Sequence, residues 1–426
     1  MRRRIIALTL TLAVGFAVLG VQLTNLGFFA ADSLRSHERN TRAAAAALGS
    51  ARGTINSIDG EILALSVRRQ GTDSQLIRTY PHGSLYAHIV GYLGPAAGSA
   101  GVERSYDNEL SGTKTDIAVR ELTDLFADSE RVGDLVLTLD HGVQLTARAA
   151  LGDRDGAVVV LDTTNGAVIA MWSRPSFDPN ALTSTASDDY DYREPPAARA
   201  YQHHYALSTP GVPAGAGADV LEGARRSMGS TGIDLPGEPA RADTDNGAVS
   251  SADDEQVLLT PLQLAQAAAA IANGGVGMRP YLVHRIQARS PDRHSDVDPS
   301  AAVPALTPPD GIGHLFEPTD AAYLLSRMTA AAQDASISLH PADGEAFSAA
   351  IATGRLALAT SGTARGGHWA VLLAPADAPT VAAAVLIEPD VGEDRGGATL
   401  AAKIAATAAE TALGLRADAD AGRDRP

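Results

Sequence analysis

The stretch that decides the fold is residues 156–173, GAVVVLDTTNGAVIAMWS. Two runs of mostly apolar, β-branched residues, 157–161 and 167–172, flank the dipeptide Asn165-Gly166. Asn-Gly favours the tight two-residue turn of a β-hairpin, because both residues tolerate a positive φ angle. The sequence therefore predicts two antiparallel strands joined by a short turn at this point of the chain.

The segments around this hairpin indicate an α+β fold. Residues 369–374 and 381–387 form a second hairpin pattern around a turn that contains two prolines. Thr260 is a good helix N-cap, Pro261 suits the first helical turn, and Gly274 is a stop signal. The helix between them is apolar on nearly all sides, so we expect it to be buried in the core. Further helices are expected over residues 101–110, 140–151, 319–334 and 400–413, and a strand over 279–286.

The N-terminus has the features of a membrane anchor. Arg2, Arg3 and Arg4 precede an apolar run that extends from Ile5 to about Leu26. About 20 such residues span the hydrocarbon core of a bilayer, and flanking arginines favour the cytoplasmic side. We expect a cytoplasmic tail at 1–4, a single membrane-spanning anchor at 5–29, and the bulk of the chain outside the cytoplasm. A cleaved signal peptide is the alternative.

Composition excludes several classes of function. The chain has 34 Lys and Arg against 50 Asp and Glu, a net charge of −16, whereas nucleic-acid binding needs a basic surface. It has no cysteine, which excludes disulfides, thiolate metal sites and cysteine nucleophiles. Its only lysines are Lys114 and Lys403, so chemistry that needs two lysines in one pocket is difficult to build here.

Several motifs follow one another in an order that is typical of one family. Arg52-Gly53-Thr54-Ile55 and Gly101-Val102-Glu103 come first. The most specific are TGIDLPGE at 231–238 and LTPLQ at 259–263, with Asn-Gly-Gly at 273–275. In this order the motifs resemble those of a class B penicillin-binding protein of the type found in high-GC Gram-positive bacteria.

The resemblance implies the domain organisation. We expect the N-terminal transmembrane helix to lead into a stalk and small β-rich pedestal, similar to a dimerisation domain, at 30–140. A shortened penicillin-binding transpeptidase-like domain is expected at 141–415, with helices packed on a five-stranded antiparallel sheet. The charged tail at 416–426 is expected to be disordered.

The family's first two catalytic motifs are missing from the expected places. The family acylates the serine of Ser-x-x-Lys, in which the lysine one helical turn later is the base. Here Pro210-Gly211 is followed by Val212, and Gly215 lies three residues further on. The single Ser-x-x-Lys, Ser111 to Lys114, lies in the pedestal, and the second motif, Ser-x-Asn, occurs nowhere. We therefore assign no catalytic residue.

The third motif survives as a remnant. The family's Lys-Thr-Gly lies on an edge strand, where a substrate peptide adds as a further strand and the lysine holds its carboxylate. Here the stretch reads Thr360-Ser361-Gly362-Thr363, which keeps the hydroxyls and the glycine but not the cation. These four residues are the expected substrate-binding remnant, with at most weak affinity for wall peptides. Arg365 and His368 lie nearby, but a solvated turn and the start of a strand are the simpler interpretations.

No metal or cofactor is expected. His203-His204 has no second cluster at ligand spacing, and the acidic runs at 188–191 and 253–255 have no ordered ligand loop.

The interval from Pro179 to Pro261 is much shorter than the family needs for its nucleophile helix and helical subdomain.

Together these features predict a catalytically inactive penicillin-binding-protein homologue that acts as a partner or scaffold in peptidoglycan synthesis. The resemblance implies a membrane-embedded glycan polymerase, or another wall-synthesis protein, as its partner. Two alternatives stay open. One is an active peptidoglycan D,D-transpeptidase that binds penicillin through a displaced serine such as Ser208 or Ser227. The other is the product of a decaying gene that barely folds.

Overall fold

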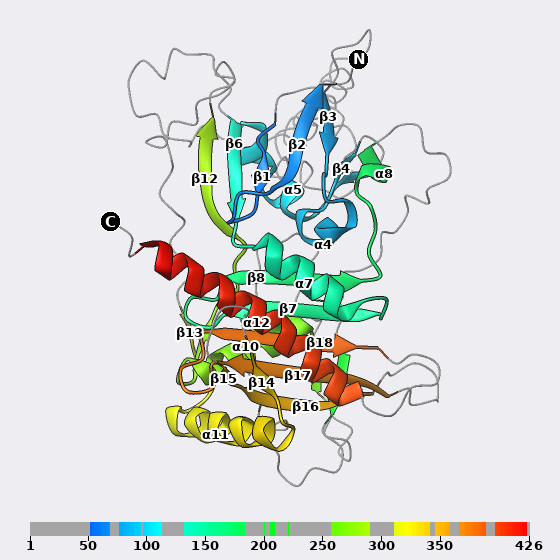
Figure 1. The fold of residues 1–426 in the computed structure, drawn as a ribbon. Helices are drawn as coiled ribbons and strands as arrows, with labels where there is room; N and C mark the ends of the chain where they lie inside the picture. Colours follow the sequence, from blue (N-terminus) through cyan, green and yellow to red (C-terminus); the bar gives the residue numbers. More distant parts are fainter. Residues whose placement is uncertain are drawn as a thin grey trace, which may run out of the picture.

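The computed structural model contains two parts, a small mixed domain and a larger one built on a long antiparallel sheet (Figure 1). It describes residues 52–68, 76–94, 97–112, 132–183, 200, 205–208, 220, 257–289, 311–340, 346–357, 366–388 and 397–423. The expected cytoplasmic tail, anchor and early stalk lie outside these residues. Of the helices within them, none has the length and apolarity needed to cross a membrane.

The small domain, the pedestal, is a five-stranded sheet in the order β12-β6-β1-β2-β3. Its strands are β1 (Ile55–Asn56), β2 (Ile62–Arg68), β3 (Leu76–Thr79), β6 (Val132–Leu137) and β12 (Val283–Arg289). β1 runs parallel to β6, and β12 runs antiparallel to it. The pedestal is therefore not confined to the expected range 30–140, because β12 returns to it from far along the chain.

Short elements complete the pedestal beside its sheet. They are η2 (Gly83–Leu85), α4 (Ala87–Val90), β4 (Leu93–Gly94), β5 (Gly98–Ser99), α5 (Gly101–Ser105) and α6 (Asp107–Ser111). The single helix expected over 101–110 is therefore two short helices that meet at Tyr106.

The large domain has a seven-stranded antiparallel sheet in the order β10-β9-β16-β17-β18-β7-β8. Its strands are β7 (Gly156–Asp162), β8 (Val168–Arg174), β9 (Tyr205–Ser208), β10 (Val257–Leu259), β16 (Ala350–Ala357), β17 (Gly366–Ala374) and β18 (Val381–Ile387). Both predicted hairpins are confirmed, and they meet where β18 pairs with β7. The expected α+β architecture is thus present, with β9 and β10 added outside β16.

The first hairpin has a longer loop than Asn165-Gly166 alone would give. Asp162 N–H donates to the Ala167 carbonyl and Gly166 N–H donates to the Asp162 carbonyl, both at 2.9 Å. The Asp162 carboxylate also accepts from Thr164 N–H at 2.8 Å, which favours the wider turn. The predicted two-residue turn was wrong. The last hydrogen bonds of the hairpin are made by Asp162 with Gly166 and Ala167, so the loop includes Thr163 and Thr164 as well as Asn165-Gly166.

Helices pack on the large sheet. α10 (Pro261–Ala272) packs against β18 and β7, whereas α12 (Gly397–Arg423) packs against β17 and β18 and crosses in front of the sheet in Figure 1. Beside α12 lies α7 (His141–Leu151), and α11 (Pro318–Asp334) packs against β16. The remaining elements are α8 (Asn180–Thr183), β11 (Val276–Met278), β13 (Gly311–His314), β14 (Ser338–Leu339) and β15 (Phe347–Ser348).

The predicted N-cap of α10 was confirmed. Thr260 and Gln263 form a capping box, in which Thr260 N–H donates to Gln263 Oε1 at 2.8 Å and Gln263 N–H donates to Thr260 Oγ1 at 3.2 Å. Asp140 caps α7 by accepting from Val143 N–H at 3.0 Å. The residues of α10 are almost all buried, as expected for a core helix.

The last helix extends further than predicted. We expected it to end at Leu413 and the chain to be disordered from Arg416, but the helical backbone continues to Arg423. Alanine alternates with aspartate over residues 417–421, and alanine has the strongest intrinsic preference for the helix. Charge alone was therefore a poor signal of disorder here.

Candidate functional site

The candidate site is the end of β16 nearest the remnant of the third motif. Thr360-Ser361-Gly362-Thr363 lies outside the described residues, in the connection between β16 and β17. The ladder between these two strands ends with Ala357 opposite Gly366. Residues 355–357 are therefore the last part of β16 whose pairing the structure shows before the remnant begins.

That part of the edge is already paired. β9 runs antiparallel to β16, with Ser208 opposite Arg355, Leu207 opposite Leu356 and Ala206 opposite Ala357. β10 in turn pairs with β9. An added peptide strand binds through the N–H and C=O groups of an edge strand, and here those groups face a segment of the same chain.

Ser208, one of the two displaced nucleophiles considered above, lies at the end of β9. The family's serine depends on a lysine one helical turn later, whereas Ser208 ends a strand and Gly211 is three residues on. Lys403, the one lysine within the described ranges, is exposed on α12. Ser227 and Lys114 lie outside those ranges. Ser208 therefore lies on a strand and not in the helical setting of the family's acylated serine.

His368 has a structural environment. It is the third residue of β17, lies opposite Arg355, and is only 7% exposed. A Cβ atom at Gly397, the first residue of α12, would overlap the imidazole ring. The ring therefore packs where α12 begins, whereas the simpler interpretation had placed this residue only at the start of a strand. Arg365 lies outside the described residues.

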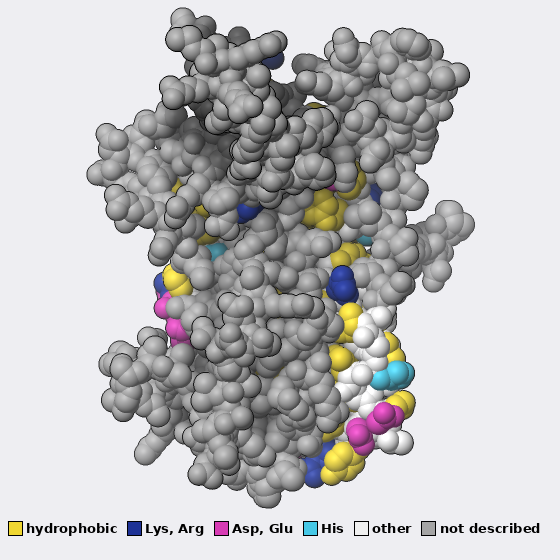
Figure 2. Space-filling model, turned by 180° about the vertical axis from the view of Figure 1, so that it is seen from behind, with side chains coloured by type: hydrophobic (Ala, Val, Ile, Leu, Met, Phe, Trp, Pro, Cys, Tyr) yellow, Lys and Arg dark blue, Asp and Glu magenta, His cyan; other side chains and the backbone are white. Residues whose placement is uncertain are grey.

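The described residues contain no candidate metal cluster, and the face seen in Figure 2 shows no patch of basic side chains among them. No group of three or more His, Asp or Glu residues there is arranged to hold a metal ion. In Figure 2 the visible Lys and Arg side chains are scattered among apolar and acidic ones. His203-His204 and the acidic runs at 188–191 and 253–255 are not among the described residues.

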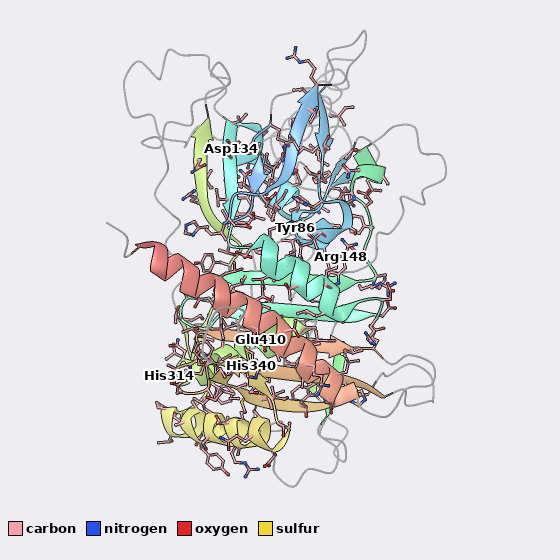
Figure 3. All side chains as sticks on the ribbon, viewed as in Figure 1. Tyr86, Asp134, Arg148, His314, His340 and Glu410 are labelled. Carbon is pink, nitrogen blue, oxygen red and sulfur yellow. The ribbon has the colours of Figure 1, made fainter. Side chains whose placement is uncertain are left out.

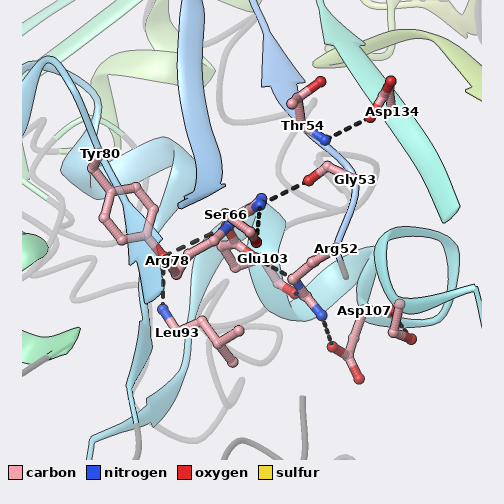
Figure 4. Close-up of polar contacts among 11 residues, drawn as sticks. Arg52, Gly53, Thr54, Ser66, Arg78, Tyr80, Leu93, Glu103, Asp107 and Asp134 are labelled. Atoms are coloured by element: carbon pink, nitrogen blue, oxygen red, sulfur yellow. Dashed lines mark hydrogen bonds and ion pairs between the residues drawn. The ribbon is translucent and has the colours of Figure 1, made fainter. Parts of the chain in front are cut away.

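The pedestal motifs build a buried ion-pair cluster around Glu103 (Figure 4). Arg52 Nε lies 2.8 Å from one Glu103 carboxylate oxygen, and Arg78 Nε lies 2.6 Å from the other. Arg52 also pairs with Asp107 at 2.6 Å, and Arg78 donates to the Gly53 carbonyl at 2.8 Å. These contacts join the segment before β1 to β3 and the two short helices, so Arg52 and Glu103 of the motifs have a structural role here.

Burial by itself would raise the pKa of Glu103. The guanidinium groups of Arg78 and Arg52 outweigh burial and hold that pKa below its ordinary value. Glu103 is therefore charged in the folded protein, and the cluster depends on that charge.

Two side-chain amides bond to pedestal backbone, Asn180 from α8, which packs on β3 and β4, and Gln144 from α7 of the large domain. Asn180 Nδ2 donates to the Tyr80 carbonyl at 2.8 Å, and Tyr80 N–H donates to Asn180 Oδ1 at 2.9 Å. Gln144 Nε2 donates to the Leu85 carbonyl at 3.0 Å. The pedestal is thus fixed to the domain that carries the candidate site by well-formed hydrogen bonds.

Comparison with known proteins gives two family matches. Residues 52–136 match the penicillin binding protein A dimerisation domain, and residues 224–410 match the penicillin binding protein transpeptidase domain. The second match begins after Pro210 to Gly215, the stretch where Ser-x-x-Lys is expected.

Two relatives extend over most of the chain. The peptidoglycan D,D-transpeptidase PbpA of Mycolicibacterium smegmatis is 30% identical over 467 residues, covering 87% of this chain and 90% of the relative. The protein of that name from Mycobacterium tuberculosis is 27% identical, covering 96% and 98%. Because the first alignment is longer than this chain of 426 residues, the relative has segments that this chain lacks.

Solved structures agree with these matches. The crystal structure of PBPA from Mycobacterium tuberculosis is 26% identical, with a TM-score of 0.65, and covers 86% of this chain and 100% of that one. Its penicillin G acyl-enzyme complex gives a TM-score of 0.64. The resemblance inferred from the motifs is confirmed: this chain belongs to the class B penicillin-binding protein family.

Proposed function

We propose that this chain is a non-catalytic member of its family that acts as a partner or scaffold in peptidoglycan synthesis. The process is supported by the relatives, which are named peptidoglycan D,D-transpeptidases. The observation that carries the non-catalytic role is the pairing of β9 with β16 over Arg355 to Ala357. The strand edge that leads into the family's third motif is covered by the chain itself.

The chemistry of acylation supports the same proposal. A serine hydroxyl needs a base that takes its proton as the acyl bond forms. Ser208 ends a strand, and neither of the two lysines lies one helical turn after a serine in the large domain. Thr360 replaces the lysine that would hold a substrate carboxylate, a charge-assisted bond of about 1.5–3 kcal/mol. Both acylation and tight peptide binding should be lost.

The described part of the pedestal supports a scaffold role. Glu103 is paired with both Arg52 and Arg78, and Gln144 of α7 donates to the Leu85 carbonyl of the pedestal. In this proposal residues 5–29 anchor the chain in the cell membrane with its bulk outside the cytoplasm. The anchor and pedestal then contact a membrane-embedded glycan polymerase or another wall-synthesis protein.

Labelling with fluorescent penicillin tests the loss of catalysis. The full chain in membranes should give no covalent band on a denaturing gel. PBPA of Mycobacterium tuberculosis, for which a penicillin G acyl-enzyme has been solved, serves as the positive control. A stoichiometric band on this chain would overturn the proposal, and mass spectrometry would then show whether Ser208, Ser227 or another serine is the nucleophile.

Co-purification tests the scaffold role. The full chain, extracted from membranes in mild detergent, should retain a glycan polymerase or another wall-synthesis protein. Capture of no such protein, with the chain itself folded and abundant, would count against the proposal. A broad, non-cooperative melt of the purified chain would instead favour the product of a decaying gene.

A further inference from the structure

Three aromatic side chains meet where the pedestal contacts the large domain. His82 and Tyr86 flank η2 of the pedestal, and His141 is the first residue of α7. The two imidazole rings have centroids 4.5 Å apart, and Tyr86 Oη lies 2.8 Å from His141 Nδ1. Figure 3 shows Tyr86 just above α7. We call these residues the His82–Tyr86–His141 cluster.

Carboxylates from both domains surround the cluster. Glu61 Oε2, from the turn after β1, lies 3.6 Å from His82 Nε2. Both carboxylate oxygens of Asp59, in the same turn, accept from His141 N–H at 3.3 Å. Asp140 caps α7 beside His141, and burial raises its pKa. These three acids can balance one added positive charge.

Adding a second positive charge to the cluster is unfavourable. Two imidazolium rings 4.5 Å apart would repel each other in a partly buried site. Burial, and then the charge of His141, lowers the pKa of His82, which is the direction such repulsion produces. Burial also raises the pKa of Tyr86, so its hydroxyl stays neutral and cannot offset the charge.

We propose that the His82–Tyr86–His141 cluster is a pH-sensitive contact that holds the pedestal against α7 at neutral pH and loosens when both imidazoles are charged. The turn that carries Asp59 and Glu61 would move together with the rest of the pedestal. Beside the cluster, Ile58 N–H of this turn donates to the Leu139 carbonyl at 2.9 Å, so loosening strains a backbone contact between the domains. This proposal does not depend on whether the chain binds penicillin.

The sign of the pH effect follows from linkage. A histidine whose pKa is lower in the folded state binds fewer protons there than in the unfolded state. Its contribution to stability is present above the ordinary histidine pKa of about 6.5 and is lost as the pH falls through the folded value. The contact should therefore be tight at about pH 7.5 and should loosen as the pH falls below the ordinary histidine pKa of about 6.5.

The absence of cysteine allows a direct test by spin labelling. Val67→Cys on β2 and Tyr323→Cys on α11 place one label in each domain, at side chains that are 43% and 56% exposed. Pulsed electron paramagnetic resonance of the full chain in detergent gives the distance distribution between them. We expect one narrow distribution at about pH 7.5 and a second, longer population at about pH 5.5.

Histidine variants in the labelled background assign the response. His141→Gln and, separately, His82→Gln should each abolish the longer population, because only one charge can then form. His82→Gln leaves the Tyr86–His141 hydrogen bond in place, so it tests the proposal even if His141→Gln folds poorly. His314→Gln, at an exposed position on β13, is the matched control and should leave the response unchanged.

Three results would overturn the proposal. The first is an identical distance distribution at both pH values in the spin-labelled chain that keeps both histidines. The second is a longer population that persists when His82 and His141 are both replaced by Gln. The third is a response that Asp140→Asn alone abolishes, because the titrating group is then the carboxylate and the histidine pair is not the switch.

Discussion

Gln144 and Met171 exchange two hydrogen bonds between a side chain and a peptide. Met171 N–H donates to Gln144 Oε1 at 2.8 Å, and Gln144 Nε2 donates back to the Met171 carbonyl at 2.9 Å. β8 is the last strand of the large sheet, so this buried amide satisfies an edge that would otherwise need a neighbouring strand. With its bond to the Leu85 carbonyl, the same side chain links the sheet edge, α7 and the pedestal.

Replacing Gln144 by Leu should therefore be costly. The variant leaves Met171 N–H and two carbonyls without their partner in a buried site, and each such group costs about 1–3 kcal/mol. We expect the free energy of unfolding to fall by about 2–4 kcal/mol in chemical denaturation. Gln333→Leu, on the exposed face of α11, is the control and should change it by less than about 0.5 kcal/mol. Equal effects of the two variants would show that Gln144 is not a structural link.

The ion-pair cluster of the pedestal gives a second prediction. Glu103→Gln removes the charge that faces Arg52 and Arg78, both almost fully buried. Breaking a buried pair in this way costs about 3–5 kcal/mol. We expect a loss of that size in denaturant unfolding, against less than about 0.5 kcal/mol for Glu317→Gln at an exposed position. A loss below about 1 kcal/mol would mean that the two arginines find other partners.

Glu103 also predicts how stability depends on pH. Its folded pKa is lowered, because Arg78 and Arg52 outweigh burial. The stabilisation is therefore present above the unfolded glutamate pKa of about 4.3 and is lost as the pH falls through the folded value. Thermal unfolding should show a decline in this acidic range that is shallower in Glu103→Gln. An unchanged slope in the variant would contradict the assignment to Glu103.

The remnant of the third motif can be tested by restoring its cation. Thr360→Lys supplies the charge that would hold a peptide carboxylate, and Leu207→Pro interrupts β9, because proline cannot donate to a ladder. Together they should tighten binding of a D-Ala-D-Ala peptide by about 10-fold or more, as measured by calorimetry. Penicillin labelling should stay absent, since the new lysine follows Ala357 at the spacing of one helical turn and so does not complete a Ser-x-x-Lys motif. Labelling in the double variant would show that a competent serine was present all along.

Local signals predicted much of this fold, because they depend on neighbours in sequence. The apolar runs around Asn165-Gly166 gave the first hairpin, and Thr260-Pro261 gave a capped, buried helix. The size of the first loop was missed, because it depends on hydrogen bonds to the Asp162 side chain. The family was also recognisable, since its motifs are short and keep their order along the chain.

Long-range pairing is what the sequence did not reveal. β9 is only four residues long and pairs with β16, which lies far along the chain. β12 pairs with β6 in the pedestal, although β7, β8, β9 and β10 of the large sheet lie between the two strands in the sequence. Neither segment carries a local mark of its partner. The remnant at Thr360-Ser361-Gly362-Thr363 lies outside the described residues and stays a prediction.

Two glycines of α12 give a matched pair of substitutions with opposite expected signs. At Gly397 an added methyl group would overlap the His368 ring, which is buried beneath it on β17. At Gly414, on the same helix, nothing lies within 4 Å of the new atom. Gly397→Ala should therefore destabilise the chain by about 1–3 kcal/mol through overpacking. Gly414→Ala should stabilise it by about 0.5–1 kcal/mol, because alanine favours the helix over glycine.

Thermal and denaturant unfolding of the two glycine variants distinguish packing from helix propensity. If propensity alone decided the outcome, both alanines would stabilise α12. If His368 packs where that helix begins, only Gly414→Ala does so, and adding His368→Ala to Gly397→Ala should recover part of the loss by making room for the methyl group. Failure of that recovery would mean that the ring does not occupy this position, and His368 would again be available to supply a charge beside the remnant.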